Sequence, residues 1–119
     1  MSRKVVITDH IYEDIDIERD IIEDAGGEVL SLGATSAEEL IDGAPDAVAV
    51  LTTRVPVTET VFEELSNLEV VVRYGAGYDN VDIDAATEHG VPVVNVPHFC
   101  TEEVATHALG LILDCDRRI

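Results

Sequence analysis

The sequence predicts an α/β protein in three layers, with a doubly wound parallel sheet of five strands covered by helices on both faces. Two observations lead to this fold class. Short, mostly β-branched runs alternate with helical segments along the chain, an order typical of parallel sheets. Most of the runs are dominated by apolar residues, as in strands buried on both faces. The chain also lacks low-complexity segments and internal repeats, which excludes repeat architectures.

The first three elements lie before residue 33. The run KVVIT at 4–8 predicts a strand. Apolar residues near helical spacing predict a helix over 11–25, with acids on its other face and two glycines as its stop. Residues 28–32 form the second expected strand.

The middle of the chain repeats the pattern. Ser36 is an N-cap followed by two glutamates, so a short helix is expected to about residue 41. A break rich in Gly and Pro leads to the apolar run AVAVL at 47–51, the third strand. Thr58 caps a helix that extends to residue 65.

The last third supplies two strands and two helices. The valine run at 70–72 is the fourth strand, and residues 83–89 form a short helix that ends before a glycine. The fifth strand is expected over 91–96, with a proline near its start. A last helix begins at Thr101 with two glutamates in its first turn.

The charge excludes some partners. The 119 residues include 25 acidic and 7 basic side chains, for a formal charge of −18. Such a protein repels nucleic acid and anionic membranes. The acids are spread along the chain and 46% of residues are hydrophobic, so this is no disordered acidic tail. We interpret the charge as adaptation to a very salty, halophilic cytoplasm, where ions screen self-repulsion. An ordinary acidic protein is the alternative.

Length and cysteine content indicate one small domain in the cytoplasm. The chain has the length of one domain, no apolar run long enough to span a membrane, and no signal-peptide pattern at its start. Cys100 and Cys115 are too few for a disulfide framework, which favours a reducing compartment.

The strongest functional signal directly follows the fourth strand, where ligands bind in such sheets. It is the segment Arg73-Tyr74-Gly75-Ala76-Gly77. The two glycines let the backbone approach a ligand and turn N–H groups toward it, and the arginine adds a positive charge. The segment therefore predicts an anion cradle. The alternative is a tight turn whose arginine pairs with a neighbouring acid. It is not a dinucleotide fingerprint, since Asn80 stands where a third glycine would be needed.

A second arginine, Arg54, follows the third strand. If the third and fourth strands end at the same edge, Arg54 and Arg73 converge on one anion. An exposed arginine paired with Glu59 or Glu63 is the other interpretation.

The remaining titratable residues predict no catalytic or metal site. The four histidines, at 10, 89, 98 and 107, show no metal-ligand spacing and no cysteine–histidine set. The run of acids between Glu13 and Asp24 is interpreted as a solvated helix face. Asp9 matches the phosphoacceptor of a signalling receiver only in position, because the acidic pair and late lysine of such domains are missing.

The last helix is apolar around nearly its whole circumference. Its apolar positions are Val104, Ala105, Ala108, Leu109, Leu111, Ile112 and Leu113. We expect another chain or further sequence to cover it.

Three segments together resemble the D-isomer-specific 2-hydroxyacid dehydrogenases. They are VRYGAGYDNVD, GVPVVNVP and TEEVATHAL, in that order along the chain. The resemblance spans the chain, is strong over 70–113, and is greatest to the branch of phosphoglycerate dehydrogenase and the C-terminal-binding proteins.

The resemblance implies a flavodoxin-like substrate-binding domain over 1–100, which would be incomplete here. Residues 101–119 would form the crossover helix into a dinucleotide-binding domain beyond Ile119. That domain would hold the family's glycine fingerprint and its catalytic Arg, Glu and His.

The resemblance also assigns roles to residues. The backbone of Tyr74, Gly75, Ala76 and Gly77 would hold the substrate carboxylate, with support from Arg73. Arg54 would reach a distal substituent or phosphate, and Val104 would pack near the nicotinamide of NAD. His107 matches a histidine often found in this helix that is not the catalytic acid.

The expected parent protein is therefore an NAD-dependent oxidoreductase acting on a small anionic 2-hydroxy or 2-oxo acid, and the 119 residues alone would not turn over. A non-enzymatic, NAD-responsive corepressor-like module of the same family is the alternative. The apolar last helix would drive homo-oligomer formation.

Overall fold

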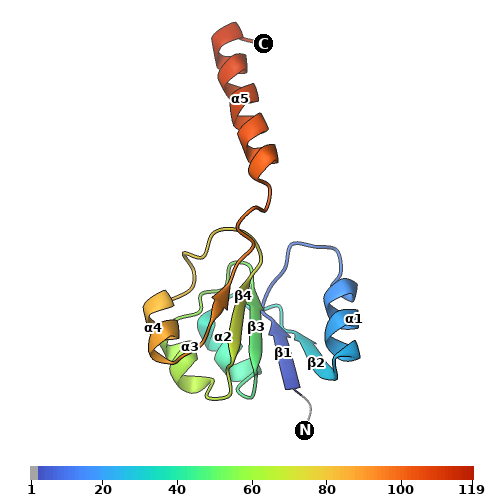
Figure 1. Cartoon of the computed structure of the whole chain (residues 1–119), viewed down its shortest axis with the longest axis vertical. Helices are drawn as coiled ribbons and strands as arrows, with labels where there is room; N and C mark the ends of the chain where they lie inside the picture. The colour runs from blue at the N-terminus through green and yellow to red at the C-terminus, as the bar shows by residue number, and fades with distance from the viewer. Residues whose placement is uncertain (1–2) are drawn as a thin grey trace.

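A five-stranded, all-parallel sheet forms the centre of the computed structural model, which describes residues 3–119 (Figure 1). The strands are β1 (Arg3–Ile7), β2 (Gly27–Ser31), β3 (Ala49–Thr52), β4 (Val70–Arg73) and β5 (Val93–Val94). Their spatial order is β2-β1-β3-β4-β5. The chain moves outward from β1 to β2 and then back past β1 to β3, so the direction of winding changes between β1 and β3. The flavodoxin-like, doubly wound prediction is confirmed.

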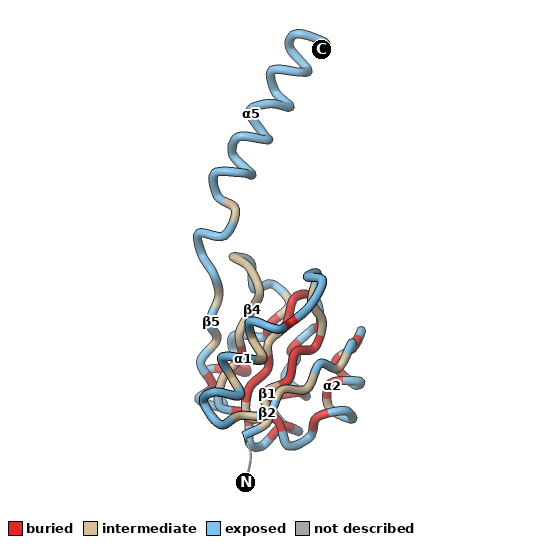
Figure 2. Tube along the Cα trace, turned by 90° about the vertical axis from the view of Figure 1, so that its right-hand side faces the viewer, coloured by how far each residue is buried: buried red, intermediate tan, exposed pale blue. Residues whose placement is uncertain are grey.

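Helices lie on both faces of the sheet. They are α1 (Asp16–Asp24), α2 (Ala37–Gly43), α3 (Glu59–Glu64), α4 (Ile83–Glu88) and α5 (Thr101–Arg117). Figure 2 shows α1 and α2 on opposite sides of β1 and β2. α1 packs on β2, whereas α3 contacts both α2 and α4. The predicted three layers are therefore present.

The main core lies between the sheet and the layer of α2, α3 and α4. Residues in register across the sheet point into it: Leu30, Val6, Val50, Val71 and Val93. Leu40 of α2 and Val61 of α3 meet this row and are fully buried. Each such side chain contributes about 1.5–3 kcal/mol through removal of apolar surface from water. This core makes the sheet a rigid platform for the loops at its edge.

The opposite face is covered less completely. Within residues 3–119, α1 packs on its β2 side, and Val70 and Val72 of β4 stay partly exposed. At the edge strand β5, Val94 is 48% exposed. The face away from the main core is therefore partly open.

Two elements are shorter than predicted by several residues. The first helix begins at Asp16, not at residue 11, because Ile11 is 62% exposed while Ile15 is the buried residue that starts the helix. β5 has two residues of the expected six. Pro92 has no N–H for the ladder, and Val96 donates to the loop after β4 instead of extending the strand.

The last helix forms as predicted but stands apart from the sheet. Figures 1 and 2 show α5 projecting beyond the edge where β4 and β5 end. Every residue of α5 is exposed, so no part of the described chain covers its apolar surface. Among residues 3–119, no helix combines the length and hydropathy needed to cross a membrane.

Candidate functional site

The loops that the sequence singled out meet at the carboxyl edge of the sheet. Thr52 of β3 is in register with Arg73 of β4, and the Tyr74 N–H donates to the Thr52 carbonyl at 2.9 Å. On the other side of β3, the Thr8 N–H donates to Leu51 at 2.9 Å. The loops after β1, β3 and β4 are therefore neighbours, at the point where the winding reverses. This is where open α/β sheets bind ligands.

The glycine loop after β4 turns its hydrogen-bond donors outward. The Gly75 carbonyl accepts from the Val96 N–H and the Ala76 carbonyl from Asn95 Nδ2, both at 2.8 Å. By contrast, the N–H groups of Gly75, Ala76 and Gly77 have no acceptor within residues 3–119. A loop with satisfied carbonyls and free N–H groups is suited to bind an anion.

The backbone N–H of Tyr74 is not free to bind a ligand, in contrast to the expected cradle of four residues. Its N–H is already bonded to Thr52, and its carbonyl accepts from the Arg73 guanidinium. The predicted four-residue cradle is thus reduced to three free N–H groups.

Gly75 is required by geometry. Its φ is +121°, a region that other residues rarely adopt, and a Cβ there would lie 3.1 Å from the Arg73 guanidinium. The glycine therefore allows the arginine to fold beneath the loop.

Arg73 is held by its own loop. Its Nε donates to Asn80 Oδ1 at 3.1 Å, and a terminal nitrogen donates to the Tyr74 carbonyl. Within residues 3–119 it forms no ion pair, so the alternative of a turn with an acid-paired arginine is not what the structure shows. Its positive charge lies beside the free N–H groups.

Arg54 is exposed, and its guanidinium has no hydrogen bond or ion pair within the described chain. The expected alternative, pairing with Glu59 or Glu63, is therefore absent from residues 3–119. A cation left unpaired in a chain of charge −18 is available to an anionic ligand.

Asp9 fixes the loop that carries Arg54. Its carboxylate accepts the N–H groups of Thr53 and Arg54 at 3.0 Å and, more distantly, that of Val55, together with the Thr8 hydroxyl at 2.8 Å. Burial alone would raise the pKa of Asp9, but these donors stabilise the carboxylate and lower the pKa below its usual value.

Asn80 joins the two arginine-bearing loops. Its side chain accepts from Arg73 and donates through Nδ2 to the Val55 carbonyl at 3.0 Å, which also accepts from the Thr52 hydroxyl. The loops after β3 and β4 are therefore linked by side chains as well as by the strands beneath them.

Tyr74 anchors the glycine loop to α1. Its hydroxyl donates to Glu18 at 2.8 Å, and its ring packs edge-on against Tyr12 with centroids 5.9 Å apart. Burial, and then the Glu18 carboxylate, raise the pKa of Tyr74 far above its usual value. The hydroxyl therefore stays protonated and acts as an anchor.

The histidines do not converge on this site. His10 bonds the Tyr12 carbonyl through Nδ1, and His89 bonds the Ala85 carbonyl at the end of α4. His98 and His107 are exposed. Among residues 3–119, no group of three acidic, histidine or cysteine side chains is placed to hold a metal ion.

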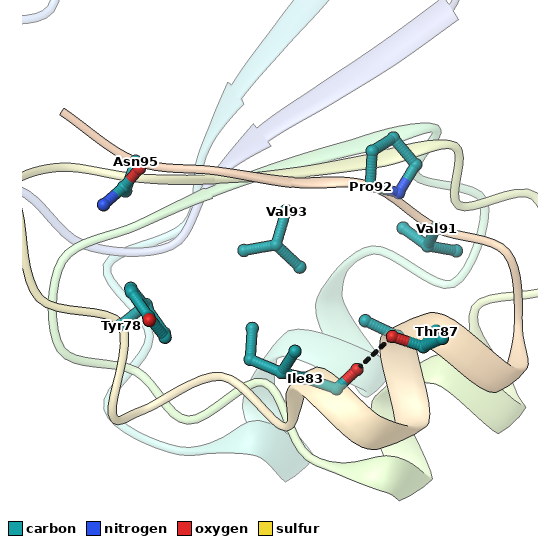
Figure 3. Close-up of a pocket in the computed structure, with 8 residues that line it drawn as sticks. Tyr78, Ile83, Thr87, Val91, Pro92, Val93 and Asn95 are labelled. Carbon is teal, nitrogen blue, oxygen red and sulfur yellow. Dashed lines mark hydrogen bonds between the residues drawn. The ribbon is translucent and has the colours of Figure 1, made fainter. Parts of the chain in front are cut away.

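A pocket of about 330 Å³ lies between α4 and β5 (Figure 3). The residues that line it are Tyr78, Ile83, Ala86, Thr87, Val91, Pro92, Val93 and Asn95. The Thr87 hydroxyl donates to the Ile83 carbonyl, so it is not free for a ligand. No charged residue lines this pocket, and it does not fit the anion that the neighbouring loop would bind.

Val104 lies on α5, away from the loops, and is 65% exposed. The structure therefore places the predicted substrate residues at one edge and leaves the predicted cofactor residue on the projecting helix.

Sequence reasoning missed the side chains that organise the site. From the sequence, Asp9 is considered only as a phosphoacceptor, Asn80 only as the residue in place of a third glycine, and Glu18 only as part of a solvated helix face. A polar residue directly after a buried strand was the available signal for Asp9, because it lies at the ligand edge.

Fold and site together define a flavodoxin-like domain whose carboxyl edge carries free N–H groups and two arginines without ion pairs among residues 3–119. The family described as D-isomer specific 2-hydroxyacid dehydrogenase, catalytic domain, matches residues 5–109. The chain belongs to this family.

Similar proteins carry related names. D-3-phosphoglycerate dehydrogenase of Methanocaldococcus jannaschii is 38% identical over 98% of this chain and 22% of its own. NAD⁺-bound 3-phosphoglycerate dehydrogenase of Entamoeba histolytica superposes with a TM-score of 0.81 at 28% identity, over 96% of this chain and 39% of that one. D-lactate dehydrogenase of Escherichia coli superposes with a TM-score of 0.72 at 30% identity, over 97% of this chain and 38% of that one. The chain thus spans about a fifth of the length of its curated relatives.

The Asp9 contacts predict a pH-dependent contribution to stability. The folded-state pKa of Asp9 is lowered, so its stabilisation is complete above the unfolded value of 3.8 and is lost as pH falls through the folded value. At pH 6, Asp9→Asn should lower the free energy of unfolding by about 1–3 kcal/mol. Urea unfolding at falling pH should show this difference narrowing. Asp20→Asn, on the exposed face of α1, is the control. A difference that stays constant down to pH 3 contradicts the assignment.

Proposed function

We propose that this chain is the substrate-binding part of an NAD-dependent D-2-hydroxyacid dehydrogenase. Such an enzyme transfers hydride between the nicotinamide and C2 of a small 2-hydroxy or 2-oxo acid. The observation that carries the proposal is the row of three free N–H groups at Gly75–Gly77 beside Arg73, with the unpaired Arg54 on the loop after the neighbouring strand β3. The names of relatives such as D-3-phosphoglycerate dehydrogenase, hydroxypyruvate reductase and D-lactate dehydrogenase favour an enzyme over a corepressor-like module.

Each part of the edge has its own role in this proposal. The N–H groups of Gly75, Ala76 and Gly77 hold the substrate carboxylate, and Arg73 adds positive charge beneath it. Arg54 binds a second anionic group at the far end of the substrate. Two fixed points on a small acid orient its C2 for reaction, which is a contribution of positioning and electrostatics.

Few residues of this chain are suited to contact NAD. NAD, when bound, supplies or accepts the hydride. Val104 fits the proposed contact with the nicotinamide because it is apolar and exposed, but α5 begins with two glutamates that would repel the cofactor's phosphates. The domain assignment, with 1–100 binding substrate and 101–119 leading to a dinucleotide domain, agrees with this division. We expect the isolated chain to have no turnover with NAD.

Titration of the isotope-labelled chain with 3-phosphoglycerate, followed by amide NMR shifts, tests the substrate role. The amides of Gly75–Gly77 should shift on binding. Arg54→Gln should weaken binding about tenfold, the loss of about 1.4 kcal/mol expected for one charge-assisted contact. Arg19→Gln, which removes an arginine of α1, is the matched control and should leave affinity unchanged. Shifts that avoid the glycine loop refute the proposal.

The apolar surface of α5 is proposed to associate with a second copy of the chain. An exposed helix with apolar residues around it favours association in water. Light scattering should give a mass above 12.9 kDa that rises with concentration. Ile112→Glu should restore the monomer, whereas Thr106→Glu, which adds the same charge at a polar position of α5, should not. An unmodified chain that is monomeric at all concentrations contradicts this.

The charge of −18 is proposed to reflect a salty cytoplasm. Molar KCl shortens the Debye length to about 3 Å and screens repulsion between the acids. The melting temperature should therefore rise by about 4–8 °C or more between dilute buffer and molar KCl. Such a rise corresponds to a gain of about 1 kcal/mol in the free energy of unfolding. A non-ionic osmolyte is the control because it does not screen charge. Equal stability in both buffers means that the protein is acidic without being halophilic.

A further inference from the structure

The Asp9 carboxylate is fully engaged with the loop after β3. Oδ1 accepts the Thr53 N–H at 3.0 Å and the Thr8 hydroxyl at 2.8 Å, while Oδ2 accepts the Arg54 N–H at 3.0 Å. The Thr53 hydroxyl also donates to the Asp9 carbonyl at 3.1 Å. With both oxygens occupied, Asp9 is placed to hold backbone rather than to bind a ligand or accept a phosphoryl group.

These contacts determine where Arg54 leaves the sheet edge. Thr53 and Val55 on either side of it are buried, at 8% and 2% exposure, so their side chains point inward. Arg54 lies between them and is exposed, with its N–H held by Asp9. With the backbone fixed on both sides, the guanidinium is limited to the space that its own side-chain torsions can reach.

The loop is also fixed toward the glycine loop. Val55 presents its N–H toward Asp9, and its carbonyl accepts from Asn80, which in turn holds Arg73. A continuous path of hydrogen bonds thus runs from Asp9 to the second arginine. The spacing between the two positive charges depends on it.

We propose that Asp9 is a positioning residue that sets Arg54 at the distance needed for the second anionic group of the substrate. This inference rests on the function proposed above and extends it to substrate selection. The binding of acids with two anionic groups would depend on Asp9. Acids with a carboxylate alone would be held by the glycine loop, so their binding would depend little on Asp9. Such selection follows from geometry, because a misplaced arginine forfeits its charge-assisted contact.

The sign of the effect separates positioning from simple charge. A carboxylate near an anion site repels the ligand, so its removal should tighten binding if repulsion were its main effect. Positioning predicts the reverse. Asp9→Asn is the suitable change because it keeps the size of the side chain, removes the charge and replaces one acceptor oxygen by a donor.

The experiment compares two probes on the full chain. NMR titrations with 3-phosphoglycerate, which has two anionic groups, and D-lactate, which has one, are run on the unmodified chain, Asp9→Asn and Asp46→Asn. Asp46 is a matched control because it pairs with Lys4 at the opposite end of β1. We expect Asp9→Asn to weaken the binding of 3-phosphoglycerate about three- to tenfold and the binding of D-lactate less than about twofold. Asp46→Asn should change neither affinity. Circular dichroism confirms that each variant is folded at the temperature used.

A second comparison tests whether Asp9→Asn acts through Arg54 or through a general loss of structure. In the Arg54→Gln background, Asp9→Asn should cause no further loss of 3-phosphoglycerate affinity, because the side chain that it positions is gone. Amide hydrogen exchange at Thr53 and Arg54 should be faster in Asp9→Asn, independent of any ligand.

The outcomes are distinguishable. Unchanged or tighter binding of 3-phosphoglycerate by Asp9→Asn overturns the positioning role and leaves the proposed function intact. Equal weakening of both probes also overturns it, because Asp9 would then act through overall structure alone. If the unmodified chain binds neither probe, the proposed function fails and the inference fails with it.

Discussion

Parallel pairing of β1, β3 and β4 in one register is the constraint on which the site depends. Because Thr52 lies opposite Arg73, the loops after these strands begin at the same height, and Tyr74 is bonded to β3 as soon as it leaves β4. The pairing is maintained by a row of valines buried beneath it. A shift of one residue would turn these valines to the other face, so the same burial that stabilises the sheet also fixes the two loops relative to each other.

A chain with so many acids can still leave N–H groups and arginine side chains unpaired, because local geometry decides which charges meet at short range. Two acids at this edge are held by donors: Asp9 accepts three backbone N–H groups and a hydroxyl, and Glu18 accepts the Tyr74 hydroxyl. The N–H groups of Gly75–Gly77 and the Arg54 guanidinium have no carboxylate bonded to them within residues 3–119. Exposed acids farther away act through solvent, where salt screens them. In molar salt, contact chemistry alone decides what binds.

Sequence reasoning recovered the order of elements along the chain and the parallel sheet, because both are recorded in neighbouring residues. Alternation of apolar runs and helices is local, as are the glycines of the loop. The hydrogen bonds from Asp9 to the loop after β3 could not be predicted from the sequence, since those partners lie 44–46 positions away and depend on which strands become neighbours. The start of α1 was missed for a similar reason: Ile11 continues the helical spacing, but only tertiary packing decides that Ile15 is the residue to be buried. The substrate and cofactor roles of Arg54, Arg73, the glycine loop and Val104 stay predictions.

The chain segment between β5 and α5 contacts the glycine loop after β4 and also leads into the projecting helix. The segment that leaves β5 toward α5 donates from Val96 and Asn95 to the carbonyls of Gly75 and Ala76. These are the residues whose N–H groups face outward, and a peptide plane held at its carbonyl is also oriented at the N–H of the next residue. Movement of α5 that pulled residues 95–100 away from the sheet would release both carbonyls and free the planes to rotate. The position of α5 and the orientation of the peptide planes in the glycine loop are therefore linked through two hydrogen bonds.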